Sequence, residues 1–135
     1  MTEQDAKQWI KKNEGLRLHP YLDTTGHVTI GWGRNLDNGI RVNEAELMFE
    51  NDYEQTVKEL EQFDWYLMQP PGVQFALINM NFNLGITKLL QFKGMIGHLK
   101  EKNYTAAAQH ALDSLWAKQV HQRAKDIALI ISEGK

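Results

Sequence analysis

The sequence of 135 residues predicts an α+β fold in which helix dominates and a small β-hairpin lies near the N-terminus. Three observations lead to this prediction. Apolar residues recur at helical spacing through most of the chain. One short stretch, His27-Val28-Thr29-Ile30, instead alternates and is rich in β-branched residues, which is typical of a strand. The turn residues Thr24-Thr25-Gly26 come directly before it.

The first helix is predicted over residues 3–13. Thr2 followed by Asp5 has the spacing of a capping pair, and Gly15 is expected to end the helix. The hairpin follows it. The two glycines of Gly31-Trp32-Gly33 then predict a tight, close-packed bend after the second strand.

The remainder of the chain is predicted to be helical. A second helix would open at Asn43 with Glu46 and continue to about residue 62. Its expected buried stripe is Phe49, Tyr53, Val57 and Leu60. Pro70-Pro71-Gly72 breaks the pattern, and a third helix ends at Gly85. Further helices are predicted over residues 93–102, 105–113 and 119–132.

This pattern predicts one domain over residues 1–135 with two unequal lobes, since the length lies within the usual single-domain range. Residues 14–64 would form a small β-containing lobe with a connecting helix. Residues 1–13 and 65–135 would form a helical lobe. The break at residues 64–72 is the predicted boundary.

Charge is unevenly distributed, with a net charge of −6 over residues 1–85 and +4 over residues 86–135. The basic half could bind a polyanion such as nucleic acid or cell wall, or form ordinary solvated helix faces. The first 20 residues are polar, and no run of 18 apolar residues occurs, so we expect neither a signal peptide nor a membrane span. We therefore expect synthesis and initial residence in the cytoplasm.

Cofactor and metal chemistry find no support in the sequence. The absence of cysteine excludes disulfides and thiolate sites. The five histidines lack paired ligand spacing, and no glycine-rich phosphate loop is present. We expect no metal and no cofactor.

Two acids flank the first strand of the predicted hairpin. Glu14 would lie in the last turn of the first helix, where unsatisfied carbonyls disfavour ionisation and favour a proton donor. Asp23 would lie beside a polar turn whose hydroxyl and amide groups keep it ionised. Such a contrast is typical of glycoside hydrolysis, although a chain with 17 acids also places pairs of this kind by chance.

The residues around these acids form a dense string: Glu14-Gly15-Leu16-Arg17-Leu18, Tyr21, Asp23-Thr24, Gly26 and Thr29-Ile30-Gly31-Trp32-Gly33. The string resembles the phage lysozyme (endolysin) family of the T4 lysozyme type. The resemblance resumes at Ala76-Leu77-Ile78-Asn79-Met80, Phe82, Leu84-Gly85, Phe92, Ala106-Ala107, Trp116 and Gln122-Arg123-Ala124. It therefore covers both ends of the chain.

The resemblance implies a lysozyme-like fold with the active cleft between the two lobes. It also implies a muramidase that hydrolyses the β-1,4 bond between N-acetylmuramic acid and N-acetylglucosamine in peptidoglycan. Glu14 would be the general acid, and Asp23 with Thr29 would hold and activate the attacking water, with inversion. The two carboxyl groups should then be about 6.5–9.5 Å apart.

Three further candidate residues each have an alternative interpretation, and two of them, Arg123 and Phe82, match the family. Arg123 matches an arginine that links the lobes by reaching the acid glutamate, but it would also suit a solvated helix face. Phe82 would border the glycan or pack in the core, and Trp32 would stack on a sugar or pack the hairpin.

The sequence also departs from the family. Arg34 stands where the family often has histidine, so a histidine–acid pair is absent or replaced. Other glycan-contact positions are occupied by Asn35, Met95 and His110.

By the same resemblance the partner is bacterial peptidoglycan, with no nucleic acid and no stable membrane binding. The chain would act as a monomeric, bacteriolytic endolysin. A holin would release it from the host cytoplasm to the periplasmic wall. Two alternatives stay open: a catalytically silent wall-binding module, and a lytic transglycosylase, which needs the acid glutamate without Asp23 and leaves anhydro ends.

Overall fold

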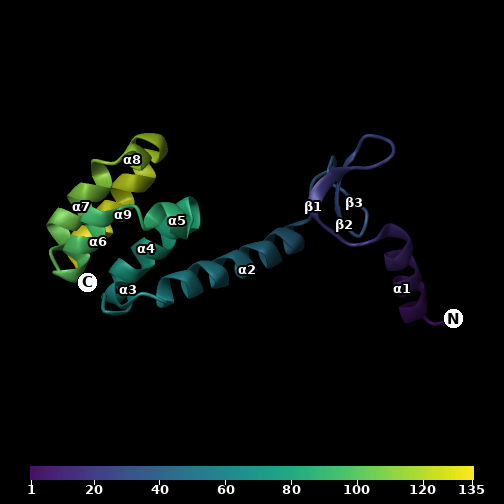
Figure 1. Cartoon of the computed structure of the whole chain (residues 1–135), viewed down its shortest axis with the longest axis horizontal. Coiled ribbons are helices and arrows are strands. Elements are labelled where there is room, and N and C mark those ends of the chain that lie inside the picture. The colour runs from purple at the N-terminus through teal and green to yellow at the C-terminus, as the bar shows by residue number, and fades with distance from the viewer. The chain divides into compact units, whose positions relative to one another are not determined.

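The computed structural model describes residues 1–135 and divides them into two compact units, Met1–Leu47 and Met48–Lys135. The N-terminal unit holds one helix, a small antiparallel sheet and the start of a long helix. The C-terminal unit is entirely helical (Figure 1). The prediction of a helix-dominated α+β fold is confirmed. The predicted grouping of residues 1–13 with the helical lobe concerns the relation between the units and stays a prediction.

The N-terminal unit follows the predicted order of helix and hairpin. Its elements are α1 (Glu3–Glu14), β1 (Arg17–Leu22), β2 (Val28–Gly31) and β3 (Arg34–Asn35). The predicted capping pair is present, since the Asp5 amide donates to Thr2 Oγ1 at 3.1 Å. The strands form an antiparallel sheet in the order β1-β2-β3, which places Thr29 opposite Tyr21 and Asn35.

The long helix α2 (Val42–Glu61) differs from its prediction at both its start and its stripe. The cap expected at Asn43 is wrong: Glu44 Oε1 instead accepts from the Arg41 amide at 2.9 Å. Leu60 is fully buried, but Phe49 and Tyr53 are 47% and 36% exposed. The predicted stripe is therefore buried only toward the C-terminal end of α2.

The C-terminal unit packs seven further helices around one apolar core. They are α3 (Asp64–Leu67), α4 (Pro71–Leu84), α5 (Ile86–Leu89), α6 (Lys93–Lys100), α7 (Tyr104–Leu112), α8 (Leu115–Val120) and α9 (Gln122–Glu133). Pro71 starts α4, where its missing N–H costs nothing, and Gly85 ends it as predicted. The fully buried apolar side chains include Leu60, Val73, Leu77, Met80, Leu89, Leu99 and Ile131. Because of this continuous core, we expect the C-terminal unit to resist local unfolding more than the rest of the chain.

One predicted helix is wrong in its continuity. The expected helix over residues 119–132 is interrupted at His121, whose φ of 49° and ψ of −110° leave the helical region. The short helices α3 and α5 were not predicted because each spans a single turn. Across the whole chain, no helix combines the length and apolar character that a bilayer span requires.

Candidate active site

Glu14 is the last residue of α1, and its side chain packs against Gly33 in the bend after β2. Gly15 ends the helix with φ of 71°, and its amide donates to Lys11 O at 2.8 Å. A Cβ atom added to Gly33 would overlap the Glu14 carboxylate and lie 2.7 Å from Glu14 Cδ. Gly33 also has φ of 73°. The bend after β2 therefore needs glycine both for its backbone and for the space that Glu14 occupies.

Asp23 begins the turn between β1 and β2 and is fixed by three hydrogen bonds to one oxygen. Asp23 Oδ1 accepts from the His27 amide at 2.8 Å, and from the Thr25 amide and hydroxyl at 2.9 Å each. The His27 amide makes the largest contribution to lowering the pKa of Asp23, and Thr25 adds to it. Asp23 is thus held as a carboxylate, as the sequence predicted, and Oδ2 accepts no hydrogen bond within the protein.

Thr29 lies in β2 and is the one buried residue of the N-terminal unit. Its Oγ1 donates to His27 O at 2.9 Å, which uses the hydroxyl proton and leaves the oxygen free to accept. The peptide groups of His27 therefore contact both Asp23 and Thr29. Sequence reasoning did not identify His27, because any residue type supplies a main-chain N–H and C=O.

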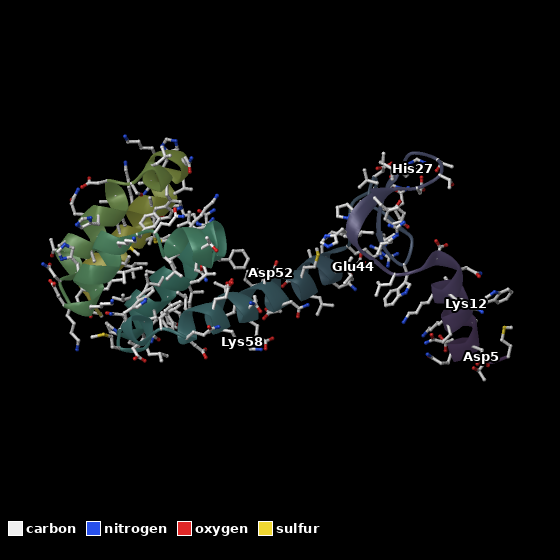
Figure 2. The ribbon with its side chains drawn as sticks, viewed as in Figure 1. Asp5, Lys12, His27, Glu44, Asp52 and Lys58 are labelled. Carbon is white, nitrogen blue, oxygen red and sulfur yellow. The ribbon has the colours of Figure 1, made fainter.

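Arg34, which stands where the resemblance predicts a histidine, forms an ion pair with Glu44. Arg34 Nη2 contacts Glu44 Oε2 in the first turn of α2, and Glu44 Oε1 accepts from the Arg41 amide. The Arg34 hydrogen bond, followed by that of Arg41, lowers the pKa of Glu44 to about 2. Figure 2 shows Glu44 at this first turn. Arg34 thus has an acid partner within the N-terminal unit, and whether this pair takes the place of the family's histidine–acid pair stays a prediction.

Trp32 lies in the bend next to Gly33 with 45% of its surface exposed. Lys11 Nζ from α1 lies 4.2 Å from the centroid of its ring, a cation–π contact. One face of the indole is thus paired with α1. The exposed part of the ring leaves room for a sugar, and both the packing of Trp32 against the hairpin and its stacking on a sugar stay predictions.

Arg123 and Phe82, in the C-terminal unit, line one pocket of about 350 Å³. Arg123 Nε donates to Asn79 Oδ1 at 2.9 Å and Nη2 to Asn79 O at 3.3 Å, so the guanidinium is anchored on α4. Phe82 is 38% exposed and lies 5.6 Å from Phe49, measured between ring centroids. It is a pocket wall rather than a core residue. The predicted link between Arg123 and Glu14 joins the two units and stays a prediction.

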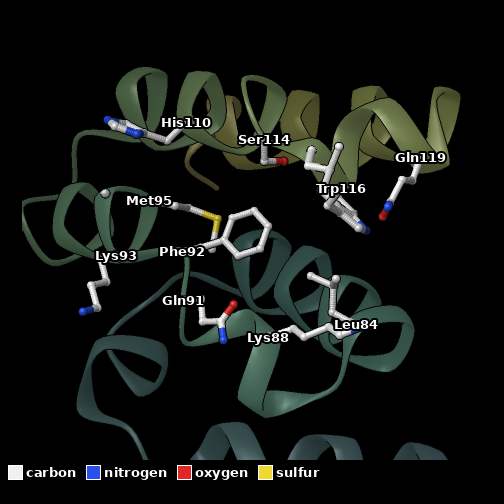
Figure 3. Close-up of a pocket in the computed structure, with 12 residues that line it drawn as sticks. Leu84, Lys88, Gln91, Phe92, Lys93, Met95, His110, Ser114, Trp116 and Gln119 are labelled. Atoms are coloured by element: carbon white, nitrogen blue, oxygen red, sulfur yellow. The ribbon is translucent and has the colours of Figure 1, made fainter.

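A second pocket in the C-terminal unit has a volume of about 470 Å³ (Figure 3). Phe92 and Trp116 give it aromatic walls, with Trp116 Nε1 donating to Asn83 Oδ1 at 2.7 Å. Met95 and His110, which the resemblance predicts to be glycan contacts, are among the residues that line this pocket, and their contact with glycan stays a prediction. Two lysines, Lys88 and Lys93, add positive charge. The sequence did not predict that these lysines line a pocket, because their spacing is also that of lysines on an ordinary solvated helix face.

No group of three or more histidine, aspartate or glutamate side chains is arranged to hold a metal ion. The chemistry available at Glu14, Asp23 and Thr29 is proton transfer and the positioning of water. These three residues come from the end of α1, the β1–β2 turn and β2, all within the N-terminal unit.

Comparison with known proteins gives this arrangement a context. The family model for phage lysozyme matches residues 11–129. The chain is 28% identical to probable T4-type lysozyme 1 of Dictyostelium discoideum, over 95% of the chain and 94% of that protein. It is 25% identical to probable T4-type lysozyme 2 of the same organism, with the same coverage.

A third relative is larger. The chain is 25% identical to the pre-baseplate central spike protein Gp5 of Enterobacteria phage T4, over 94% of the chain but 27% of that protein. The alignments with the two Dictyostelium lysozymes extend over 159 positions, more than the 135 residues of the chain, so these relatives carry residues that it lacks. The match over residues 11–129 spans far more than half of the sequence. The chain therefore belongs to the phage lysozyme family of the T4 type.

Proposed function

We propose that the chain is a muramidase that hydrolyses the β-1,4 bond between N-acetylmuramic acid and N-acetylglucosamine in bacterial peptidoglycan. Membership of a lysozyme family supports a glycosidase that acts on the cell wall. The names of the two Dictyostelium relatives, both T4-type lysozymes, support the same activity.

The environment of Asp23 is the observation that carries this proposal. Three donors hold Oδ1, and Oδ2 stays free to accept from a water molecule. Thr29 Oγ1 donates its own proton to His27 O, which leaves its oxygen able to accept, and we propose that it accepts from the same water. An ionised carboxylate and a hydroxyl acceptor together suit the activation of a nucleophilic water.

In the proposed mechanism, Glu14 protonates the glycosidic oxygen as the bond to the sugar breaks. The water held by Asp23 and Thr29 attacks the anomeric carbon from the opposite face and transfers a proton to Asp23. The configuration at that carbon inverts, which requires carboxyl groups about 6.5–9.5 Å apart. Two carboxylates and one water suffice for this reaction, so no cofactor is invoked.

We further propose that the protein acts as a monomeric endolysin. It would accumulate in the host cytoplasm and reach the periplasmic wall through a holin. Degradation of the wall would then be bacteriolytic. These proposals rest on the family resemblance.

The test measures the clearing of permeabilised Gram-negative cells, with the released fragments analysed by mass spectrometry. We expect wild type and Glu3→Gln to clear the cells and release reducing N-acetylmuramic ends, and Glu14→Gln to be inactive. Glu3→Gln is the matched control because it removes a carboxylate from the other end of α1. Anhydro ends would instead show a transglycosylase, and wall binding without release would show a silent module.

A further inference from the structure

His27 connects the two residues proposed to hold the attacking water. Its amide donates to Asp23 Oδ1 at 2.8 Å, and its carbonyl accepts from the Asp23 amide at 2.9 Å. The same carbonyl accepts from Thr29 Oγ1 at 2.9 Å. The position of Asp23 relative to Thr29 therefore depends on where the main chain of residue 27 lies.

The side chain of His27 is itself fixed. His27 Nδ1 lies 2.6 Å from Asp37 Oδ2, and both side chains are about half exposed. Asp37 is held in turn, because its amide donates to Asn35 Oδ1 at 2.8 Å and Asn35 lies opposite Thr29 in the sheet. The ion pair between His27 and Asp37 thus connects the β1–β2 turn to the segment after β3. Figure 2 shows His27 at this turn.

We propose that protonated His27, held by Asp37, is a positioning residue that fixes Asp23 and Thr29 for the attacking water. The proposal rests on the hydrolase function proposed above. His27 does not touch substrate in it. The imidazolium anchors the turn to Asp37 and places a positive charge near the Asp23 carboxylate.

The charged groups that face His27 are Asp37, from the segment after β3, and Asp23, from the β1–β2 turn. The hydrogen bond to Asp37 is the largest cause of a raised pKa for His27, followed by the charge of Asp23. Because the pKa is raised, the ion pair is fully formed below the ordinary histidine value of 6.5. It is lost as pH rises through the raised value.

The first experiment measures kcat on solubilised wall glycan against pH for His27→Gln, Asp37→Asn and the control His19→Gln, which removes an exposed histidine of β1. The quantity compared is the ratio of the variant kcat to the wild-type kcat at each pH, which cancels pH effects common to both proteins. We expect His27→Gln to lower kcat about tenfold below pH 6, with KM unchanged. The ratio should return toward one at high pH, where wild type has also lost the imidazolium.

For Asp37→Asn, the ratio of variant to wild-type kcat should be lowest at pH values between the ordinary and the raised pKa of His27. Only in this range is His27 protonated in wild type but neutral in the variant. The double variant should be no worse than His27→Gln, because the two side chains act as one unit. A ratio for His27→Gln that stays at one, or that is equally low at every pH, would overturn the proposal.

The second measurement needs no activity. The titration of the Asp23 carboxyl, followed by NMR in the full chain, should move to higher pH in His27→Gln and stay unchanged in His19→Gln. An unchanged Asp23 titration in His27→Gln would overturn the positioning role. If wild type releases no wall fragments, the proposed function fails, while the Asp23 titration still decides this inference.

Discussion

Gly33 links backbone conformation to the placement of the candidate acid. Its φ of 73° is costly for a residue with a Cβ, and that Cβ would occupy the space of the Glu14 carboxylate. Gly39 has a similar φ of 77° with no atom within 4 Å of an added Cβ. The two glycines thus carry the same backbone requirement, but only one contacts the site.

We expect Gly33→Ala and Gly39→Ala to lose similar stability, about 1–2 kcal/mol each, in urea unfolding followed by circular dichroism. Only Gly33→Ala should lose wall hydrolysis, by about 100-fold, because it displaces Glu14. Equal activity in the two variants would show that the contact between Gly33 and Glu14 is unimportant for the reaction.

The residues of the candidate site were predictable to different degrees. The ionised state of Asp23 was predictable, because Thr24, Thr25 and Gly26 mark a turn whose donors face an acid at its start. The role of His27 was not, because it acts through peptide groups that every residue has. The partner of Arg34 was not predictable either, since Glu44 lies ten residues away and only the fold brings them together.

Among the elements, the start of α2 depends on the charge of Glu44. The pKa of Glu44 is lowered from its ordinary value of 4.5 to about 2. The contribution of this carboxylate to stability is therefore fully present above pH 4.5. That contribution is lost as pH falls from about 4.5 through about 2. Stability in this range therefore reports the pair with Arg34.

We expect wild type to lose stability between pH 4.5 and pH 2 more steeply than Glu44→Gln, measured as the urea midpoint at each pH. Glu46→Gln is the matched control, because it removes a carboxylate from α2 and leaves the pair with Arg34 intact. The same slope in wild type and Glu44→Gln would contradict the role of this ion pair.

The junction of α8 and α9 shows where sequence patterns fail at the scale of an element. Gly85 ends α4 as predicted, because glycine favours positive φ. His121 ends α8 with φ of 49°, a conformation that histidine does not signal. The apolar spacing continues through the break, so periodicity alone predicted one helix.

His121→Gly should therefore raise the free energy of unfolding by about 0.5–1 kcal/mol, since glycine relieves the positive φ at some cost in unfolded-state entropy. Gln122→Gly, one residue inside α9, should instead lower it by about 1 kcal/mol. Thermal and urea unfolding would check both. A loss of stability in His121→Gly would mean that the imidazole makes contacts that outweigh the strain.

For the whole molecule, burial is concentrated in one of the two units. Every buried apolar side chain lies between Leu60 and Ile131, whereas the N-terminal unit buries only Thr29. Each fully buried aliphatic side chain contributes roughly 1.5–3 kcal/mol. The proposed catalytic residues therefore lie in the unit with the weaker core of its own.

We expect amide hydrogen exchange of the full chain to show this difference. Amides of β1 and β2 should exchange through local openings well below the global free energy of unfolding, and those of α4 only near that global value. Equal protection of the sheet and α4 would show that the N-terminal unit unfolds together with the C-terminal core.

The break at His121 also sets the number of residues that can lie between Trp116 and Arg123, two side chains that form hydrogen bonds with α4. Trp116 and Arg123 are seven residues apart, which an unbroken helix would stretch to about 10.5 Å along its axis. Their hydrogen-bond partners on α4, Asn83 and Asn79, are only four residues apart, about 6 Å. The interruption of the helix shortens the distance between Trp116 and Arg123, so that it matches the distance between their partners on α4. Residues 116–123 should therefore accept neither insertion nor deletion, and the extra residues of the longer relatives are expected to lie elsewhere in the chain.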